Sequence, residues 1–119
     1  MTAKIKALKF GAMAEHLAAV LLRLKGYRIL ARQMRSPLGE IDIIARRGRT
    51  LAFIEVKARA TMTQAIEAVN FHQRGRIERA ALAYTANHPG FAEFNLRFDL
   101  IAVAPWQVPK HLPNAWQVN

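Results

Sequence analysis

Carboxylates interrupt two apolar segments near the middle of the chain. Asp42 lies within EIDIIAR (residues 40–46), and Glu55 lies within LAFIEVKAR (residues 51–59), two residues before Lys57. Segments rich in Ile, Val and Phe are typical of buried strands, where a carboxylate is costly unless it has a partner. The whole chain has only eight acidic residues, so their presence here indicates a chemical role.

The two segments are expected to form a β-hairpin that brings these residues together. A hairpin that turns at residues 48–49 fixes the register, and this register places Asp42 opposite Glu55 and Glu40 opposite Lys57. The pair Glu40–Lys57 is explained equally well by an ordinary cross-strand ion pair and by a functional role.

Strand alternation assigns these residues to faces of the sheet. Asp42 and Ile44 share one face with Phe53 of the opposite strand, whereas Ile41 and Ile43 point to the other face. Apolar neighbours on the carboxylate face imply that another element covers it. This argues against the alternative, in which the carboxylates are simply exposed on an open sheet.

Opposed carboxylates indicate a metal site. Like charges directly across a strand pair destabilise it unless a cation lies between them or one carboxyl stays protonated. Mg²⁺ is commonly held by one or two carboxylates together with waters and phosphate oxygens, and Asp42 with Glu55 supplies that minimal set. Lys57 could orient or deprotonate a water and stabilise the charge that develops at phosphorus.

The overall charge favours a polyanionic partner. Eighteen Lys and Arg against eight Asp and Glu give a formal net charge of +10. Most of these cations are Arg, whose guanidinium suits bidentate phosphate contacts, so nucleic acid is the simplest partner. A merely solvated basic surface is the alternative. The candidate nucleic-acid contacts are Arg32, Arg35, Arg46, Arg47, Arg59, Arg74 and Arg76.

Several function classes are excluded or disfavoured. No cysteine is present, which excludes disulfides, thiolate metal sites and Cys nucleophiles and is consistent with a reducing cytoplasm. The four His lack metal-ligand spacing. The chain contains no G-x-S-x-G motif, so a Ser hydrolase is disfavoured. The longest apolar run near the N-terminus, LAAVLL, is too short for a signal peptide or a membrane span. We therefore expect a soluble cytoplasmic protein with no membrane partner.

The elements that must position the candidate residues follow from periodicity. We expect an α/β fold in a single domain spanning residues 1–119, with a core at about 10–104 and an irregular, Pro-containing tail at 105–119 that has at most a short strand near Trp116. Residues 61–69 are ambiguous between a short helical turn and a loop. The expected elements are a helix at 10–25, strands at 27–33, 40–46 and 51–59, a helix capped by Asn70 and Gln73 and running to about 87, and a strand at 95–103. This order predicts one mixed sheet flanked by helices.

One further carboxylate lies on the first helix. The residues three and four positions from Glu15 are Gly or Ala, so none of them can pair with it. Small neighbours would let the sheet approach closely. A solvated Glu and a functional carboxylate are equally consistent with this pattern.

The motif Asp, then Glu-x-Lys on the next strand, resembles the PD-(D/E)xK signature of restriction-endonuclease-like nucleases. Here Asp42 and Glu55-Val56-Lys57 occupy the motif, and Ile41 replaces its Pro. From Gly11 to Val103 the chain also resembles the bacterial YraN-like family, which is related to Holliday-junction resolvases. The segments that carry this resemblance are GAMAEHLAAVLLRLKGYRIL, GEIDIIA, FIEVKAR, RIERAALAY and LRFDLIAV.

The resemblance implies a restriction-endonuclease-like α-β-β-β-α-β core and a nuclease site. Glu15, Asp42 and Glu55 would hold Mg²⁺ or Mn²⁺, and Lys57 would join them in catalysis on DNA. Gln73 stands where the family often has Lys, so it could contact nucleic acid by hydrogen bonding but not by charge. Asp99 matches a recurring family position and is expected to form an Arg–Asp pair or a buried orienting contact.

The leading interpretation is a metal-dependent DNA nuclease. A branched recombination or repair intermediate is the substrate that the resemblance suggests, and such a substrate would favour a homodimer. The alternatives are a nucleic-acid-binding module without catalysis and an adaptor in DNA processing.

Overall fold

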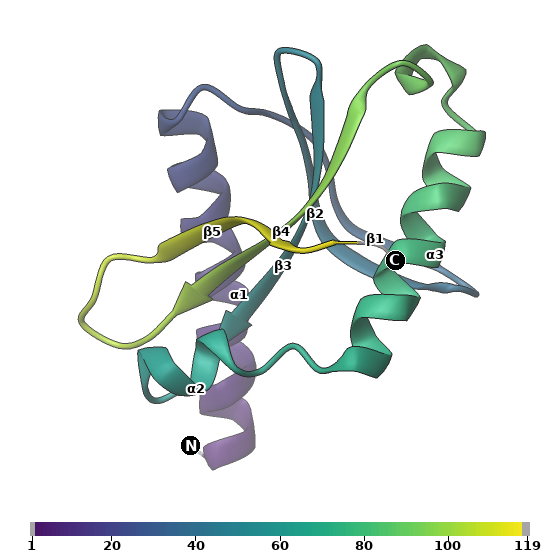
Figure 1. The fold of residues 1–119 in the computed structure, drawn as a ribbon. Coiled ribbons are helices and arrows are strands. Elements are labelled where there is room, and N and C mark those ends of the chain that lie inside the picture. Colours follow the sequence, from purple (N-terminus) through teal and green to yellow (C-terminus); the bar gives the residue numbers. More distant parts are fainter. Residues whose placement is uncertain (1, 118–119) are drawn as a thin grey trace.

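A five-stranded mixed sheet forms the centre of the molecule (Figure 1). The computed structural model describes residues 2–117. The strands lie in the order β1-β2-β3-β4-β5, with β3 parallel to β4 and every other neighbouring pair antiparallel. The elements are α1 (Ala3–Leu24), β1 (Arg28–Ser36), β2 (Gly39–Arg47), β3 (Thr50–Ala58), α2 (Met62–Ile66), α3 (Phe71–Ala86), the 3-10 turn η1 (Pro89–Phe91), β4 (Asn95–Val103) and β5 (Lys110–Trp116).

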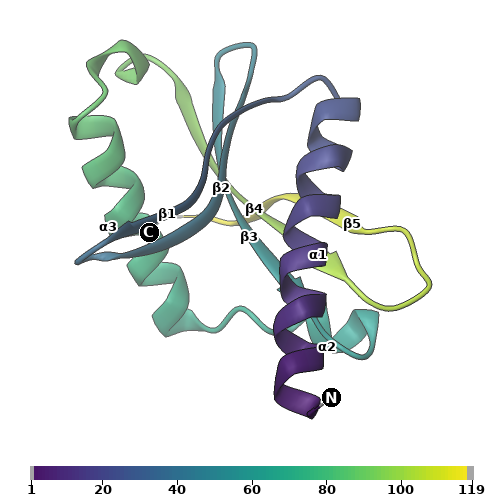
Figure 2. The same cartoon turned by 180° about the vertical axis from the view of Figure 1, so that it is seen from behind.

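Helices cover both faces of the sheet, as the element order predicts. α1 packs on one face through Ala14, Ala18 and Leu22, and small residues allow this close approach. α3 packs on the other face through Ile77 and its neighbours (Figures 1 and 2). The result confirms the α/β fold with one mixed sheet, which is consistent with a restriction-endonuclease-like fold.

The β2–β3 hairpin has the expected register. Arg47 pairs with Thr50, and the ladder continues in register to Ile43 and Ile54. Gly48 takes a φ of +59° in the turn, a conformation that glycine adopts without the steric cost borne by other residues. Turn length and the apolar pattern were therefore sufficient to set this pairing.

Other boundaries differ from the expectation. α1 begins seven residues earlier, at Ala3, and its N-terminal turns project beyond the sheet (Figure 2). The ambiguous segment contains the short helix α2, which is capped by Thr61. No helix within residues 2–117 has the length and apolarity needed to cross a membrane. The capping box of Asn70 and Gln73 at the start of α3 is confirmed.

The tail is more ordered than expected, because the short strand expected near Trp116 extends over residues 110–116 as the edge strand β5. Asp99 on β4 is fully buried and holds this strand in place. Its carboxylate accepts hydrogen bonds from the His111 side chain at 2.8 Å and from the Asn114 backbone N–H at 2.9 Å. Arg97 completes the network with bonds of 2.8 and 2.7 Å. The expected Arg–Asp pair is therefore present, and it also anchors a strand.

Asp99 should make the stability depend on acidic pH. Burial alone would raise its pKa, but the hydrogen bonds from His111, Arg97 and Asn114 outweigh burial and lower the pKa from 3.8 to about 2. Because the folded-state pKa is the lower one, this stabilisation is present above about pH 4 and disappears as the pH falls toward 2.

The difference corresponds to about 2 kcal/mol of unfolding free energy. Urea unfolding between pH 2 and pH 5 should show the wild type losing that much more stability on acidification than Asp99→Asn. Equal losses in the two proteins would contradict this role of Asp99.

Candidate active site

Asp42 lies where strands β2 and β3 separate. The regular ladder ends at the pair Ile43–Ile54, and in the continued register Val56 would face Ile41. Instead, the Val56 N–H donates to Asp42 Oδ2 at 2.7 Å. The carboxylate thus satisfies a backbone donor that a regular strand would satisfy with a carbonyl group.

The orientation of Ile41 confirms this irregularity and corrects the expected alternation. Ile43 packs in the cluster on the α1 side of the sheet, whereas Ile41 packs with Ile44 on the α3 side. Two residues apart in a regular strand, Ile41 and Ile43 would face the same way. The regular alternation of side chains along β2 is therefore broken at Asp42, which lies between these two isoleucines.

Glu55 and Lys57 lie beside Asp42 and are largely buried. Glu55 Oε1 is 3.3 Å from Lys57 Nζ, and these two side chains are 13% and 11% exposed. Burial, together with the nearby charge of Asp42, raises the pKa of Glu55 to about 8. Burial is also the main cause that raises the pKa of Asp42, and the two carboxyls share a hydrogen bond. Two carboxyls are therefore held together in surroundings where both cannot readily be charged.

Glu40 does not pair with Lys57 as the hairpin register suggested. Its carboxylate forms an exposed ion pair of 2.7 Å with Arg35, which lies opposite it across the β1–β2 ladder. Lys57 turns to Glu55 on its own strand. Glu40 has β1 as a second neighbouring strand, and the analysis of the β2–β3 hairpin alone did not include this strand.

Glu15 has partners that come from β1. Its carboxylate is buried, and its oxygens accept bonds of 3.1 Å from Arg32 Nε and from Gln33 Nε2. Gln33 has a φ of +50°, an uncommon conformation for a residue other than glycine. The Glu15 charge contributes to the raised pKa of Asp42, so it acts on the site at a distance. Arg32 is therefore a counter-ion of Glu15 in this structure.

The expected group of three carboxylates is not formed. Within residues 2–117, no three His, Cys, Asp or Glu side chains lie close enough together to hold a metal ion. Asp42 and Glu55 meet, while Glu15 is held by Arg32 and Gln33. In so basic a chain a buried helical carboxylate readily acquires a cationic partner, and sequence spacing could not identify that partner.

A small cavity adjoins the carboxylate pair on the α3 side. Its volume is about 120 Å³, and Glu40, Glu55, Gln73 and Arg76 line it together with Ile77. Gln73 uses its Oε1 in the capping box, so its NH₂ group is the part that could meet a ligand. Gly39, the first residue of β2, lets α3 approach closely here, because a Cβ at this position would lie 2.9 Å from the Arg76 carbonyl oxygen.

Most of the remaining candidate arginines lie away from the cavity at Glu55. Arg59 follows directly after β3, where its Nη1 donates to the Ala58 carbonyl oxygen at 2.8 Å. Arg74 lies against the Trp116 ring, with its Cζ 5.6 Å from the ring centroid, and does not line the cavity at Glu55. Arg46 and Arg47 lie at the tip of the hairpin, away from the carboxylates. The structure therefore brings only Arg76 and Gln73 to the cavity.

The pair Asp42–Glu55 suits a divalent cation. A cation between the carboxyls would offset their mutual repulsion and the cost of burying charge, which together raise the pKa of Glu55. Two carboxylates match the small ligand set of Mg²⁺, which keeps several waters. Each oxygen of Glu15 already accepts one hydrogen bond, from Arg32 or from Gln33.

Comparison with known proteins identifies the family. The model of the uncharacterised protein family UPF0102 matches residues 14–103. The chain is 52% identical over 113 residues to a UPF0102 protein of Paramagnetospirillum magneticum, covering 92% of this chain and 88% of that protein. It is 53% identical over 109 residues to a UPF0102 protein of Methylorubrum extorquens, covering 92% and 85%. The chain belongs to this family.

Membership in UPF0102 confirms the YraN-like resemblance, and the matched region contains the whole candidate site. Residues 14–103 include Glu15, Asp42, Glu55 and Lys57 and end with β4. The edge strand β5 of this UPF0102 protein lies beyond the matched region. The family description itself assigns no activity.

The raised pKa of Glu55 should appear in the stability of the metal-free UPF0102 protein. The folded-state pKa of about 8 exceeds the ordinary value of 4.5, so the folded protein binds this proton more tightly than the unfolded chain. Stability should therefore fall as the pH rises from about 5 to 8, by a few kcal/mol at most.

Urea unfolding in EDTA between pH 5 and pH 9 measures this effect. Glu55→Gln stays neutral and should flatten the profile, and Asp42→Asn should flatten it in part by removing a neighbouring charge. A wild-type profile identical to that of Glu55→Gln would contradict the assignment.

Proposed function

We propose that this UPF0102 protein is a metal-dependent nuclease that hydrolyses phosphodiester bonds of DNA. The observation that carries this proposal is the buried pair of Asp42 and Glu55. Lys57 lies beside Glu55, and Glu55 lines a cavity. A chain with a net charge of +10 concentrates carboxylates at this one place, which suits a cation bound next to a phosphate.

Each residue has a defined part in this reaction. Asp42 and Glu55 would hold Mg²⁺ or Mn²⁺ with their carboxylate oxygens. When bound, the ion supplies Lewis-acid polarisation of the phosphoryl group and lowers the pKa of a bound water. The Lys57 ammonium donates to the attacking water or to a non-bridging phosphoryl oxygen and stabilises the charge that develops there.

Hydrolysis joins the water oxygen to phosphorus and breaks one phosphorus–oxygen ester bond. The water proton passes to solvent, and the departing oxygen takes up a proton, which leaves a phosphomonoester end and a hydroxyl end. Arg76 and the Gln73 amide line the cavity next to Glu55 and are placed to contact the phosphate backbone. A branched DNA substrate and a homodimer belong to the same proposal and rest on the family resemblance. A cytoplasmic location belongs to it as well and rests on the absence of Cys and of a long apolar segment.

A nucleic-acid-binding module without catalysis, which could serve as an adaptor in DNA processing, is the second candidate. It is favoured by the ion pair of Glu15 with Arg32, which leaves two carboxylates instead of three at the site. Such a module would bind DNA with a strong salt dependence and leave it intact.

Cleavage assays distinguish the two candidates. The protein is incubated with linear, nicked and four-way-junction DNA in Mg²⁺, Mn²⁺ or EDTA. Asp42→Asn, Glu55→Gln and Lys57→Gln should each lower the cleavage rate at least about a hundredfold, since each removes a group that acts on the reacting phosphate. Glu67→Gln, which removes an exposed carboxylate that does not line the cavity at Glu55, is the matched control and should cleave normally.

Two results would overturn the nuclease proposal. One is cleavage that persists in EDTA or in Asp42→Asn at the wild-type rate. The other is binding of these DNAs with no cleavage under any condition, which would establish the binding module.

Metal binding can be measured without DNA. At pH 8, millimolar Mn²⁺ or Mg²⁺ should raise the melting temperature of the wild type by several degrees, because a ligand that binds only the folded state stabilises it. Asp42→Asn should respond by less than about a degree, and Glu67→Gln should respond like the wild type. An equal rise in all three proteins would show that the ion binds elsewhere.

A further inference from the structure

Four exposed arginines gather at the tip of the β2–β3 hairpin. Arg46 and Arg47 end β2, Arg49 lies in the turn, and Arg28 begins the neighbouring strand β1. The turn lies at the opposite end of the molecule from α2 (Figure 1). We call these four residues the hairpin-tip patch. The sequence analysis included Arg46 and Arg47 among many basic residues and missed the other two.

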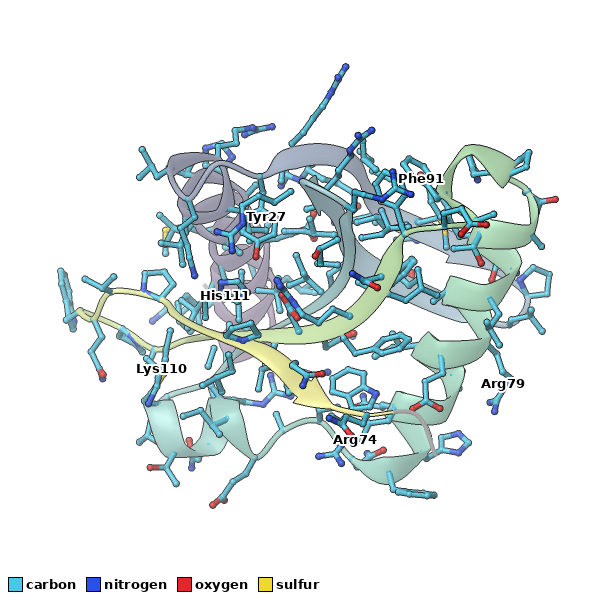
Figure 3. All side chains as sticks on the ribbon, turned by 45° about the horizontal axis from the view of Figure 1, so that its top comes forward. Tyr27, Arg74, Arg79, Phe91, Lys110 and His111 are labelled. Atoms are coloured by element: carbon cyan, nitrogen blue, oxygen red, sulfur yellow. The ribbon has the colours of Figure 1, made fainter. Side chains whose placement is uncertain are left out.

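Aromatic rings hold three of these guanidinium groups in place. The Cζ atoms of Arg46 and Arg49 lie 4.7 and 5.3 Å from the centroid of Phe94, and that of Arg47 lies 4.5 Å from the centroid of Tyr27. Tyr27 lies on the α1 side, whereas Phe91, which packs against Phe94, lies on the α3 side (Figure 3). Stacking on a ring orients a guanidinium and leaves its charge unneutralised.

The polar contacts of the patch also leave its charge in place. Arg46, Arg47 and Arg49 donate to the backbone carbonyl oxygens of residues 48, 25 and 93. None of the ion pairs found within residues 2–117 involves a member of the patch. The adjacent acidic residue, Glu93, contributes its carbonyl group to Arg49. By contrast, Arg32, Arg35 and Arg97 each have a carboxylate partner.

The patch also contains a like-charge pair. Arg28 lies directly opposite Arg46 in the β1–β2 ladder, and like charges across a strand pair destabilise it. An anion bound between them would remove that cost. The guanidinium of Arg46 is ordered on Phe94, and that of the next residue, Arg47, is ordered on Tyr27. These features together suit a polyanion with regularly spaced phosphates.

We propose that the hairpin-tip patch binds the phosphate backbone of a DNA duplex on one side of the scissile bond. Arg46 and Arg47 follow Asp42 by four and five residues on one strand, or roughly 13–17 Å at the strand rise. Along a duplex this distance corresponds to about 4–5 base pairs. The position of the scissile bond rests on the proposed function, whereas binding of the duplex by the patch does not.

Binding in EDTA tests the patch without any need for cleavage. Fluorescence anisotropy of a labelled 20-base-pair duplex is measured from 50 to 300 mM salt with the wild type and with the variant Arg46→Gln/Arg47→Gln/Arg49→Gln. The control variant Lys4→Gln/Arg79→Gln/Lys110→Gln removes the same charge at exposed positions. Figure 3 shows Arg79 and Lys110 on α3 and β5, away from the tip. Circular dichroism confirms that both variants are folded.

The tip variant should bind at least about tenfold more weakly at 100 mM salt. The slope of log K against log[salt] should also be smaller in magnitude by about 2–3, because each lost phosphate contact lowers it by about 0.9. The control variant should lose less than about threefold. Equal losses in the two variants, or wild-type binding by the tip variant, would overturn the proposal.

Two further measurements separate the outcomes. Anionic phosphatidylglycerol vesicles should bind the tip variant and the control variant alike, because the two variants carry the same net charge. If vesicle binding depends on the tip while DNA binding does not, the patch is a membrane contact and the proposal fails. If the tip variant loses DNA binding but the wild type cleaves no DNA, the nuclease proposal fails and the duplex-binding surface remains.

Discussion

The hydrogen bond from the Val56 N–H to the Asp42 carboxylate is the contact on which the candidate site depends. It replaces a rung of the β2–β3 ladder, so the two strands part where the carboxyl groups need room. The Val56 N–H holds the Asp42 carboxylate in position, and Glu55 lies beside it. Without this bond, a regular ladder would place both carboxylates on a continuous pleated face with no local opening between the strands.

The distribution of charge follows from the small number of carboxylates. Glu15, Glu40 and Asp99 are each paired with an arginine, and Asp99 also anchors the edge strand β5 through His111 and Asn114. Asp42 and Glu55 are the two that are held against each other. The electrostatic cost of burying them together is offset by the packing of the rest of the domain, and this cost makes the pair responsive to a cation.

One strand connects the acidic site with the basic tip. β2 carries Asp42 near its start and Arg46 with Arg47 at its end, so the acidic site and the basic tip lie on one continuous strand. Because the hairpin tip is braced by Tyr27 and Phe94 from other elements, its guanidinium groups are ordered before any ligand arrives. Preorganised groups lose less conformational entropy on binding.

Features that depend on local spacing could be predicted from the amino-acid sequence. The length of the turn set the hairpin register, Asn70 and Gln73 set the start of α3, and the motif placed Asp42 near Glu55. Contacts between residues of different elements became known from the three-dimensional packing. It paired Glu15 with Arg32 and Glu40 with Arg35, turned Ile41 to the α3 side, and made β5 out of the tail through Asp99. Periodicity reports which way a side chain faces along its own strand or helix, whereas these contacts depend on the element that packs against it, and spacing along the chain does not specify that neighbour.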